Sequence, residues 1–376
     1  MRVLFTGVPV YGHLLPLLPL ARAFRRRGDS VAILVPASLA HSFADEDLDM
    51  LFAGADSPTV RAEVASRSGT DLRTSSNQDA AIEAFVTARI DLSIEECTSV
   101  TRQWRPDIVI HDPMDFVGPY LASVCDVPHA VLTFGADVSA DFIRASSDRA
   151  VQDYARRGVS WHAARWTLDI CPPDLQVEGW QPPPGWMPLR PEAHQAPSGT
   201  PTREPKPLTG DPKVLITFGT VFTNPTALSP LINELTAHGA GLRITLGTTT
   251  SAGDFTVDHP QVVFEDFLPY NLLLDKIDIV VAHGGAGTNL GALAAGCPLV
   301  LLPQGADQKG QGERVAAAGA AVQVTSEPVD AIAVARTVID VAKASSYRLK
   351  AEEIARRIAA MPTPDEVATR LAAALA

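Results

Sequence analysis

The sequence predicts an α/β protein with two doubly wound domains that face each other across a cleft. Three observations support this prediction. The chain has 376 residues and is 46% apolar, which is enough for two cores of about 150 to 200 residues each. Short, continuous apolar runs alternate with segments of helical periodicity, as in parallel sheets covered on both faces. A proline-saturated stretch at 171–212 divides two such series, and its later part is expected to hold the domain boundary.

The first half opens with an apolar strand at 2–6, a loop at 7–12 and a helix. Pro16 and Pro19 are tolerated only near a helix start, so the helix is expected to begin at 15–17 and to stop at Gly28. This start would place His13 at the positive end of the helix. Branched apolar runs predict further strands at 31–35, 108–110 and 130–134.

The second half repeats this alternation without a short sequence repeat. Strands are expected at 214–217, 242–246, 262–264, 279–282 and 299–302, and helices at 228–237, 289–295, from 308 onward and within 331–375. We therefore expect an N-terminal domain at 1–200, a linker at 201–212 and a C-terminal domain at 213–376. The last helix of the chain could pack back on the N-terminal domain.

Composition excludes several classes of function. A net charge of -12 disfavours nucleic acid as a partner. The one dense basic patch, at 22–27, falls where the first helix should end, so a structural role is favoured. Four cysteines without paired or Cys/His spacing argue against a zinc site and a disulfide framework. With no uninterrupted apolar run of about 18 residues, we expect no membrane partner and a cytoplasmic protein with reduced thiols.

The segment AHGGAGTNLGALAAGCPLVLLPQGADQ, at 282–308, has the most informative pattern. Gly284, Gly285 and Gly287 follow a buried strand and open a helix, where backbone N–H groups favour a phosphate. A tight turn that needs glycine for packing alone would explain a lone glycine pair equally well. A second glycine-containing strand end, TFGT at 217–220, favours a shared anion site. The chain contains no P-loop and no G-x-G-x-x-G, so a dinucleotide dehydrogenase is disfavoured.

These residues resemble a known family. The residues that carry the resemblance are His283, Gly284, Gly285, Gly287, Thr288, Ala292, Leu293, Gly296, Pro298, Pro303, Asp307 and Gln308. Together they resemble the donor signature of family 1 glycosyltransferases, which have the GT-B fold of two Rossmann-like domains. The opening of the chain, with Gly12, His13, Pro16, 18–21 and Gly28, resembles the start of the same family. The chain looks most similar to the actinobacterial branch that glycosylates antibiotics and other secondary metabolites.

The resemblance implies a site for a nucleoside diphosphate sugar, such as a dTDP- or UDP-sugar, in the C-terminal domain. Its implied contacts are His283 with Gly285, Gly287 and Thr288 on the diphosphate, Thr220 assisting them, Phe267 and Leu268 at the base, and Asp307 with Gln308 on the sugar. Two positions depart from the family. Gly291 stands where Glu usually contacts the ribose, and Gln311 stands where Asn is usual, which leaves the preferred nucleotide open.

A general base is expected in the N-terminal domain. His13 is suited to take the proton of an acceptor because the reference pKa of histidine, about 6.5, leaves it largely neutral at physiological pH. A histidine base needs an orienting acceptor, and Asp112 closes the strand DIVIHD, where it resembles the aspartate of the family's dyad. Asp115 lies close by as a second candidate, and His111 could be confused with the base.

The chemistry implied is transfer of a hexosyl-type sugar with inversion of configuration and without a metal cofactor. The helix terminus and His283 would stabilise the leaving diphosphate in place of a metal ion. The acidic run at 45–49 contains Asp-x-Asp but is interpreted as a solvated loop. The expected acceptor is a hydroxyl group of a small hydrophobic metabolite, such as a polyketide or antibiotic aglycone. The aromatic residues that could stack on it, or simply pack, are Phe85, Phe134, Trp161, Trp166 and Trp180.

Two other functions remain open at this point, and the chain could also form a homodimer. One is a non-catalytic nucleotide-sugar binder or auxiliary protein, which the absence of Glu at Gly291 mildly favours. The other is a sugar-nucleotide epimerase of GT-B type, which the first helix and the Asp307-Gln308 pair disfavour. The presence of both His13 and Asp112 favours a transferase.

Overall fold

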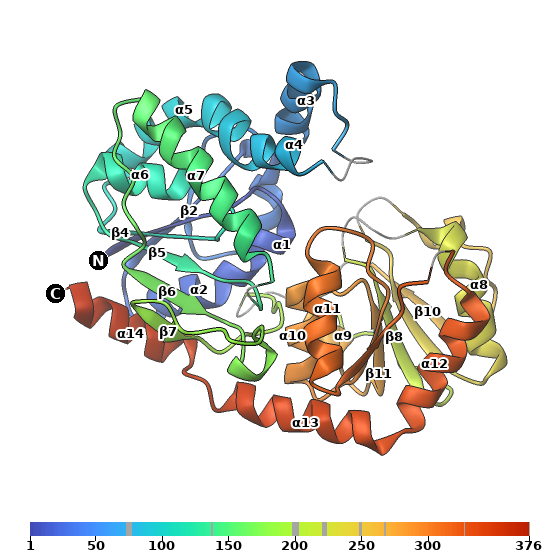
Figure 1. Cartoon of the computed structure of the whole chain (residues 1–376). Helices are drawn as coiled ribbons and strands as arrows, with labels where there is room; N and C mark the ends of the chain where they lie inside the picture. Colours follow the sequence, from blue (N-terminus) through green and yellow to red (C-terminus); the bar gives the residue numbers. More distant parts are fainter. Residues whose placement is uncertain are drawn as a thin grey trace.

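The computed structural model describes residues 1–72, 77–136, 138–197, 203–219, 224–247, 250–266, 268–326 and 328–375. Within these ranges the chain forms two α/β halves that lie side by side, each built on one parallel sheet (Figure 1). The predicted fold class is therefore confirmed.

The first sheet has seven strands in the order β3-β2-β1-β4-β5-β6-β7, and all neighbouring strands are parallel. The chain starts at the centre of the sheet, builds outward in one direction, and then returns to lay β4 on the other side of β1. Such a reversal is a topological switch point, where open parallel sheets bind ligands. The strands are β1 (Arg2–Thr6), β2 (Ser30–Val35), β3 (Asp49–Phe52), β4 (Ile108–His111), β5 (His129–Leu132), β6 (Trp166–Asp169) and β7 (Trp186–Pro188).

Helices flank this sheet. They are α1 (Tyr11–Leu14), α2 (Leu18–Arg26), α3 (Ser57–Ser68), α4 (Gln78–Glu83), α5 (Arg89–Trp104), α6 (Val117–Cys125) and α7 (Ala140–Arg156). Short 3-10 segments lie at Leu15–Leu17, Ala37–Phe43 and Pro173–Leu175, and a π-helical turn at Ala84–Ala88 leads into α5.

The second sheet repeats the winding with six parallel strands in the order β10-β9-β8-β11-β12-β13. Its switch point lies between β8 and β11. The strands are β8 (Lys213–Thr217), β9 (Gly241–Thr245), β10 (Val262–Glu265), β11 (Ile279–Ala282), β12 (Leu299–Leu301) and β13 (Ala321–Gln323). The helices are α8 (Pro225–Ala237), α9 (Tyr270–Leu273), α10 (Ala286–Ala294) and α11 (Gln308–Ala317), with a 3-10 turn at Ala252–Asp254.

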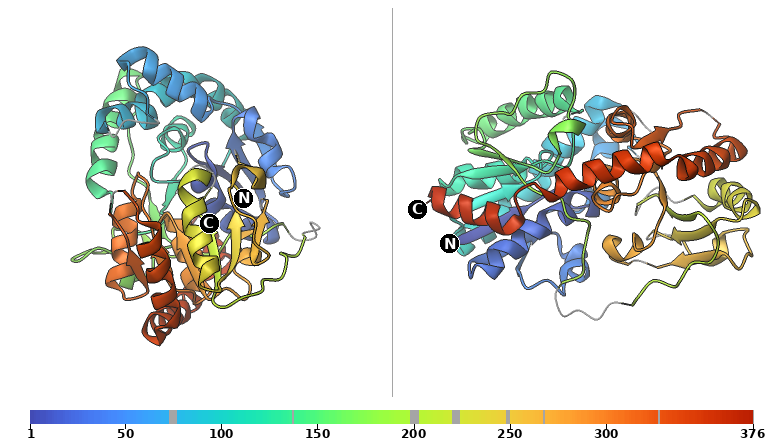
Figure 2. Two further views of the ribbon diagram at one scale, coloured as in Figure 1. Left: turned by 90° about the vertical axis from the view of Figure 1, so that its right-hand side faces the viewer. Right: turned by 90° about the horizontal axis from the view of Figure 1, so that it is seen from below.

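The last three helices connect the halves. Helix α12 (Ala331–Lys343) packs on α8, α13 (Ser345–Ala359) packs on α10, and α14 (Pro364–Leu375) reaches α2 in the first half. Figure 2 shows α13 and α14 running from one half to the other. An ion pair between Arg26 and Asp365, with an N–O distance of 2.9 Å, joins α14 to α2 at the surface. The end of the described chain is thus part of the contact between the two halves.

The predicted boundaries of two helices are wrong. Helical structure begins at Tyr11 rather than at 15–17, so His13 lies inside α1 and not ahead of a helix. Pro16 and Pro19 each occupy the first turn of a new segment, which divides the region into three short helical pieces. Helix α10 begins at Ala286 rather than Asn289, because extended Gly285 caps it and Gly287 is accommodated in its first turn. Four strands, β3, β6, β7 and β13, were not predicted.

One hydrophobic cluster spans both halves. It contains residues of one face of the first sheet, of α2 and α14, and of α10 and α13 in the second half. Its members include Phe24, Leu132, Leu215, Leu293 and Leu371. Continuous burial of this kind stabilises a fixed arrangement of two domains more than a polar contact would. No helix among the described residues is both long and apolar enough to cross a membrane.

Removing apolar volume from α14 should destabilise the protein. Leu371 is fully buried in the shared cluster, so Leu371→Ala is expected to lower the free energy of unfolding by about 2–5 kcal/mol. Leu349→Ala is the matched control, because Leu349 is 61% exposed and should change the same quantity by less than about 1 kcal/mol. Urea denaturation measures both. Equal effects of the two variants would contradict a structural role for the α14 contact.

Candidate active site

The predicted site residues that the structure describes follow strands of the two sheets, and some of them flank the two switch points. In the first sheet, His13 follows β1 and Asp112 follows β4. In the second sheet, Gly219 follows β8 and His283 follows β11, again on either side of the reversal. These are the carboxyl ends of the strands, the edge at which such sheets bind ligands.

His13 and Asp112 form a hydrogen-bonded pair. The distance from His13 Nδ1 to Asp112 Oδ1 is 3.1 Å, and the side chains are 20% and 1% exposed, respectively. Because an ionised carboxylate can only accept, Nδ1 carries the proton and Nε2 presents a lone pair. The ring of Phe134 meets the His13 ring edge-on, with centroids 4.8 Å apart. The imidazole is thus held in one tautomer and one orientation.

The Asp112 carboxylate is held by backbone groups as well. Its Oδ2 accepts from the Val8 N–H at 2.7 Å, and its Oδ1 accepts from the Met114 N–H at 2.7 Å. Burial alone would raise the pKa of Asp112, but the facing His13, the Val8 N–H and the charge of Arg89 lower that pKa below its ordinary value. Asp112 is therefore ionised at neutral pH and stabilises positive charge on the His13 ring.

Asp115 has a different role. It accepts from the Thr6 hydroxyl at 2.5 Å and from the Gly118 N–H at 3.2 Å, and it pairs with Arg89 at 2.9 Å. It is Asp112, then, that contacts His13. Sequence reasoning missed Arg89, whose buried guanidinium also donates to the Gly7 carbonyl at 2.8 Å. The sequence signal that could have identified Arg89 is its spacing: it falls on the same helical face as the buried residues of α5.

His111 points away from the pair. Its Nδ1 donates to the Asp112 carbonyl oxygen at 2.8 Å, and its Nε2 lies 2.9 Å from His129 Nδ1. Burial lowers the pKa of His111, and burial lowers the pKa of His129 to about 3. His111 is thus a neutral, internally bonded residue and does not compete with His13 as a base.

Glycines surround His283 in the second half. A Cβ on Gly285 would lie 2.6 Å from His283 Nε2, and one on Gly219 would lie 3.2 Å from His283 Cε1. Gly219 and Gly284 have φ values of +68° and +92°, which side chains rarely adopt. Burial lowers the pKa of His283 to about 4, against the opposing effects of the Thr217 backbone and Asp307. At neutral pH the ring offers hydrogen bonding without a full charge.

Helix α10 presents an open N-terminus beside this turn. Gly285 is its extended cap, and the Asn289 side chain closes the turn by donating to the Gly284 carbonyl at 2.9 Å. A Cβ on exposed Gly287 would meet no atom within 4 Å, so there is space above the first turn. Thr288 is half-buried in the same turn. The unpaired N–H groups of a helix start and its partial positive charge can bind a phosphate here.

Asp307 and Gln308 stand at the start of α11, the next helix along the chain after α10. Asp307 Oδ2 accepts from Gln311 Nε2 at 3.1 Å. The oxygen of the buried Gln308 side chain accepts from the Gln304 and Gly305 N–H groups at 2.7 and 3.1 Å. The Gln308 oxygen thus stabilises the turn at 304–305. The N–H groups of the same amide could donate to a ligand.

The expected base pocket is only partly described. Thr220 and Phe267 lie outside the described residues, and half-buried Leu268 packs against the shared hydrophobic cluster. At Gly291 an added Cβ would lie 2.6 Å from Tyr270 Cε1. Tyr270 therefore fills the room that the usual glutamate would need, and its hydroxyl donates to the Thr288 carbonyl at 3.1 Å.

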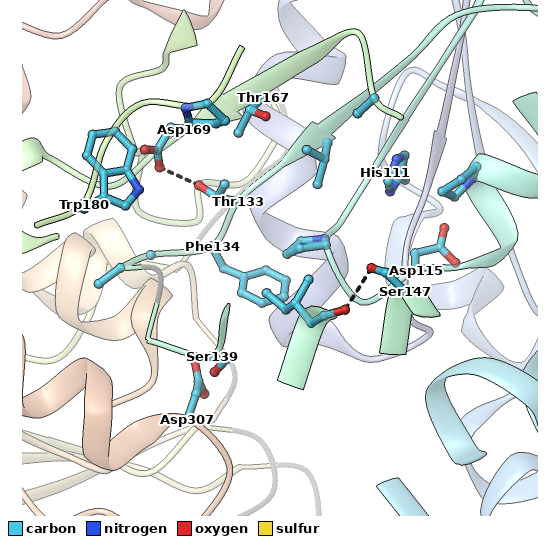
Figure 3. A pocket seen from close by; sticks show the side chains of 18 of the residues that line it. His111, Asp115, Thr133, Phe134, Ser139, Ser147, Thr167, Asp169, Trp180 and Asp307 are labelled. Atoms are coloured by element: carbon cyan, nitrogen blue, oxygen red, sulfur yellow. Dashed lines mark hydrogen bonds between the residues drawn. The ribbon is translucent and has the colours of Figure 1, made fainter. Parts of the chain in front are cut away.

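A cavity of about 330 Å³ lies in the first half, and Asp307 and Gln311 line it from the second half. The loop after β5, carrying Phe134, lines its middle, and Asp307 reaches it from the second half next to Ser139 (Figure 3). Asp169 and Trp180 lie at one end of the cavity, and His111 and Asp115 lie at the other. Of the five aromatic residues proposed for an acceptor, Phe134, Trp161 and Trp180 line the cavity, whereas Phe85 stacks near His13 and Trp166 is buried.

The charged runs singled out in the sequence pair with each other. Arg22 contacts Glu46 at 2.5 Å, and Arg25 contacts Asp47 at 2.9 Å. Arg26 and Arg27 pair with Asp365 and Asp29. None of these residues lines the cavity, which supports the structural interpretation of the arginine patch. The acidic run was expected to be a solvated loop, but the Glu46 side chain is only 5% exposed and Asp49 begins β3. Among the described residues, no group of three or more His, Cys, Asp or Glu side chains is arranged to hold a metal ion.

Two family models match the chain. The model described as erythromycin biosynthesis protein CIII-like, N-terminal domain, matches residues 29–182, and its C-terminal counterpart matches residues 233–374. Among curated proteins, the chain is 27% identical to the elloramycin glycosyltransferase ElmGT of Streptomyces olivaceus, over 99% of this chain and 97% of that protein. It is 26% identical to the L-demethylnoviosyl transferase of Streptomyces niveus, over 99% and 98%.

Solved structures share the fold. Spinosyn rhamnosyltransferase SpnG superposes with a TM-score of 0.83 at 23% identity, over 99% of this chain and 100% of that one. SpnG has also been solved with thymidine diphosphate and with spinosyn aglycone. SnogD from Streptomyces nogalater superposes with a TM-score of 0.79 at 24% identity, over 100% and 99%.

The lowered pKa of His283 predicts a pH dependence of stability. Below about pH 6.5 the unfolded chain protonates this histidine, whereas the folded chain resists protonation down to about pH 4. The unfolded state then binds more protons, so His283 lowers the free energy of unfolding as pH falls through this window, by up to about 1.4 kcal/mol per pH unit.

The variant His283→Asn should therefore show a shallower loss of stability between pH 6.5 and about 4 than the wild type, measured by urea denaturation. His238→Asn serves as a control, since the His238 side chain is 48% exposed at the end of α8, and its slope should match the wild type. A slope for His283→Asn equal to that of the wild type would show that His283 is not buried in its neutral form.

Proposed function

Because the chain belongs to the EryCIII-like glycosyltransferases of GT-B fold, we propose that it transfers a sugar from a nucleoside diphosphate sugar to a hydroxyl group of a small secondary metabolite. We further propose inversion at the anomeric carbon and independence of a metal ion. The family, the fold and the enzyme class predicted from sequence are confirmed by the family models and by relatives named as antibiotic-pathway transferases. The auxiliary and epimerase alternatives lose support for the same reason.

The observation that carries the proposal is that one cavity is lined both by a residue that contacts the expected base and by a residue expected to hold the donor sugar. Asp307 lines the cavity from the second half, and Phe134, which contacts His13, lines it from the first. A donor held at the α10 terminus and by Asp307 would then meet an acceptor near His13. Holding both reactants in this way can supply a large part of the rate enhancement.

His13 is proposed as the general base. Its Nε2 would take the proton of the acceptor hydroxyl while the oxygen bonds to the anomeric carbon from the face opposite the diphosphate. The bond from that carbon to the diphosphate oxygen breaks, and the leaving group takes the electron pair. The positive charge formed on His13 is stabilised by the Asp112 carboxylate, which lies 3.1 Å from Nδ1.

The leaving diphosphate is proposed to bind at the α10 terminus, beside the His283 ring. Fixed N–H dipoles in a shielded site stabilise developing negative charge without reorganising, which makes a metal ion unnecessary. A dTDP- or UDP-sugar is the proposed donor, and thymidine diphosphate bound to SpnG supports dTDP. The cavity's aromatic residues and its volume of about 330 Å³ support a compact apolar acceptor such as a polyketide aglycone.

Replacing the base tests the reaction type. His13→Ala is expected to lower kcat by about 10²–10⁴ with little change in KM, and Asp112→Asn should also lower kcat because the carboxylate charge is lost. The exposed residue His41 provides the control His41→Ala, which should retain full activity. Transfer is assayed with dTDP- and UDP-sugars and polyketide acceptors in EDTA, and NMR of the product gives its anomeric configuration. Loss of activity in EDTA, retention of configuration, or full activity of His13→Ala would each refute part of the proposal.

Adding charge above α10 tests the donor site. Gly287→Asp places a carboxylate where an added Cβ meets no atom within 4 Å, so the fold should tolerate it. Repulsion of the diphosphate is expected to raise the dissociation constant of dTDP at least tenfold, measured by calorimetry. Gly253→Asp is the matched control on the surface, where the nearest atom to an added Cβ is Ser251 Oγ at 3.8 Å. Equal dTDP affinity in the two variants would place the nucleotide elsewhere.

A further inference from the structure

Gln311 joins the two halves at the cavity. It lies on α11 and is 6% exposed. Its Oε1 accepts from the Ala136 N–H at 3.1 Å, and its Nε2 donates to the Ala136 carbonyl oxygen at 3.1 Å. The same Nε2 also donates to Asp307 Oδ2 at 3.1 Å. One amide side chain thus connects the loop after β5 in the first half to the carboxylate proposed to hold the donor sugar.

The chemistry of this contact is specific. An amide offers an acceptor and a donor side by side, so it pairs with both polar groups of one backbone residue as a neighbouring strand would. Ala136 is itself buried, and its carbonyl oxygen also accepts from the Val138 N–H at 2.8 Å. Buried backbone groups need such partners, because leaving one unsatisfied is costly.

Small residues bring the two halves close enough for this contact. A Cβ on Gly135 would lie 2.8 Å from Ala286 Cβ and 2.8 Å from Gln311 Oε1. On the other side, a Cβ on Gly310 would lie 3.0 Å from Val138 Cβ. The halves must lie close together for Gln311 to reach Ala136, and the two glycines leave the room for this close approach.

The loop held by Gln311 also reaches the proposed base. Phe134 stands two residues before Ala136 and meets the His13 ring edge-on. Gln311 therefore contacts both Asp307 and the loop whose Phe134 packs against the His13 ring. We propose that Gln311 is a positioning residue that couples the separation of the two halves to the alignment of His13 with the donor sugar. The catalytic part of this proposal rests on the proposed transferase function.

Two variants test the two requirements at Gln311. Gln311→Met keeps the length and removes the hydrogen bonds, whereas Gln311→Asn keeps the amide and shortens the reach. Both are expected to lower kcat at least tenfold, to change the dTDP dissociation constant by less than threefold, and to speed hydrogen exchange of the Ala136 amide at least tenfold. Gln103→Met, at an exposed glutamine of α5, is the control and should change none of these.

A third variant approaches the contact from the other half. Gly135→Ala should push the halves apart, because the added Cβ meets Ala286 and Gln311. It should reproduce the kcat loss and the faster exchange of Ala136, and small-angle scattering should show a larger radius of gyration. Gly253→Ala is its control. If the Gln311 variants do not fold, Gly135→Ala decides the question.

Two outcomes would overturn the proposal. The first is a folded Gln311→Met or Gly135→Ala protein with kcat and Ala136 exchange both within twofold of the wild type. The second is a loss of dTDP affinity as large as the loss of kcat, which would make Gln311 part of the donor site. If the wild type transfers no sugar, the proposed function fails, while exchange and scattering still show whether Gln311 holds the two halves together.

Discussion

The buried carboxylate of Asp112 is the constraint on which the first half of the site depends. It accepts hydrogen bonds from the loop after β1, through Val8, from the loop after β4, through Met114, and from His13. Two segments that are distant in sequence, residues 8–13 and 112–114, are thus held together by one charged group. A buried carboxylate is stable only when fully bonded, so the fold and the alignment of His13 are maintained by the same contacts.

The second half is built differently, because glycines and the start of α10, rather than a buried carboxylate, shape the proposed donor site. Gly219, Gly284 and Gly285 enclose a neutral His283, and α10 presents its N-terminus to open space at Gly287. The two halves meet through a continuous hydrophobic cluster and a polar contact at Gln311. The apolar cluster stabilises the contact, but apolar packing is not directional. The hydrogen bonds at Gln311 have a defined geometry and therefore define one distance between the halves.

Much of the fold could be predicted from the sequence, because buried central strands are continuous apolar runs with few alternatives. The strands β3, β6, β7 and β13 were missed for the converse reason. β3, β7 and β13 are edge strands with half-exposed or exposed residues. β6 is internal and mostly buried, but its four residues include Thr167 and Asp169 and so do not form an apolar run. The arginine patch was interpreted as structural and the Asp-x-Asp run as a solvated loop. The structure shows Arg22 and Arg25 of the patch paired with Glu46 and Asp47 of the run, and Arg26 paired with Asp365. Arg89 was missed because its burial depends on Asp115 and Gly7, which are far away in the sequence.

The sequence by itself determined the fold class, the glycine turn that follows β11, and the family, because these depend on local backbone requirements and on the order of residues along the chain. Only the tertiary structure decided that Asp112 rather than Asp115 faces His13, that Tyr270 fills the space beside Gly291, and that Gln311 reaches Ala136 across the two halves. Each of these depends on which strands and helices become neighbours in space, and residue spacing along the chain does not contain that information.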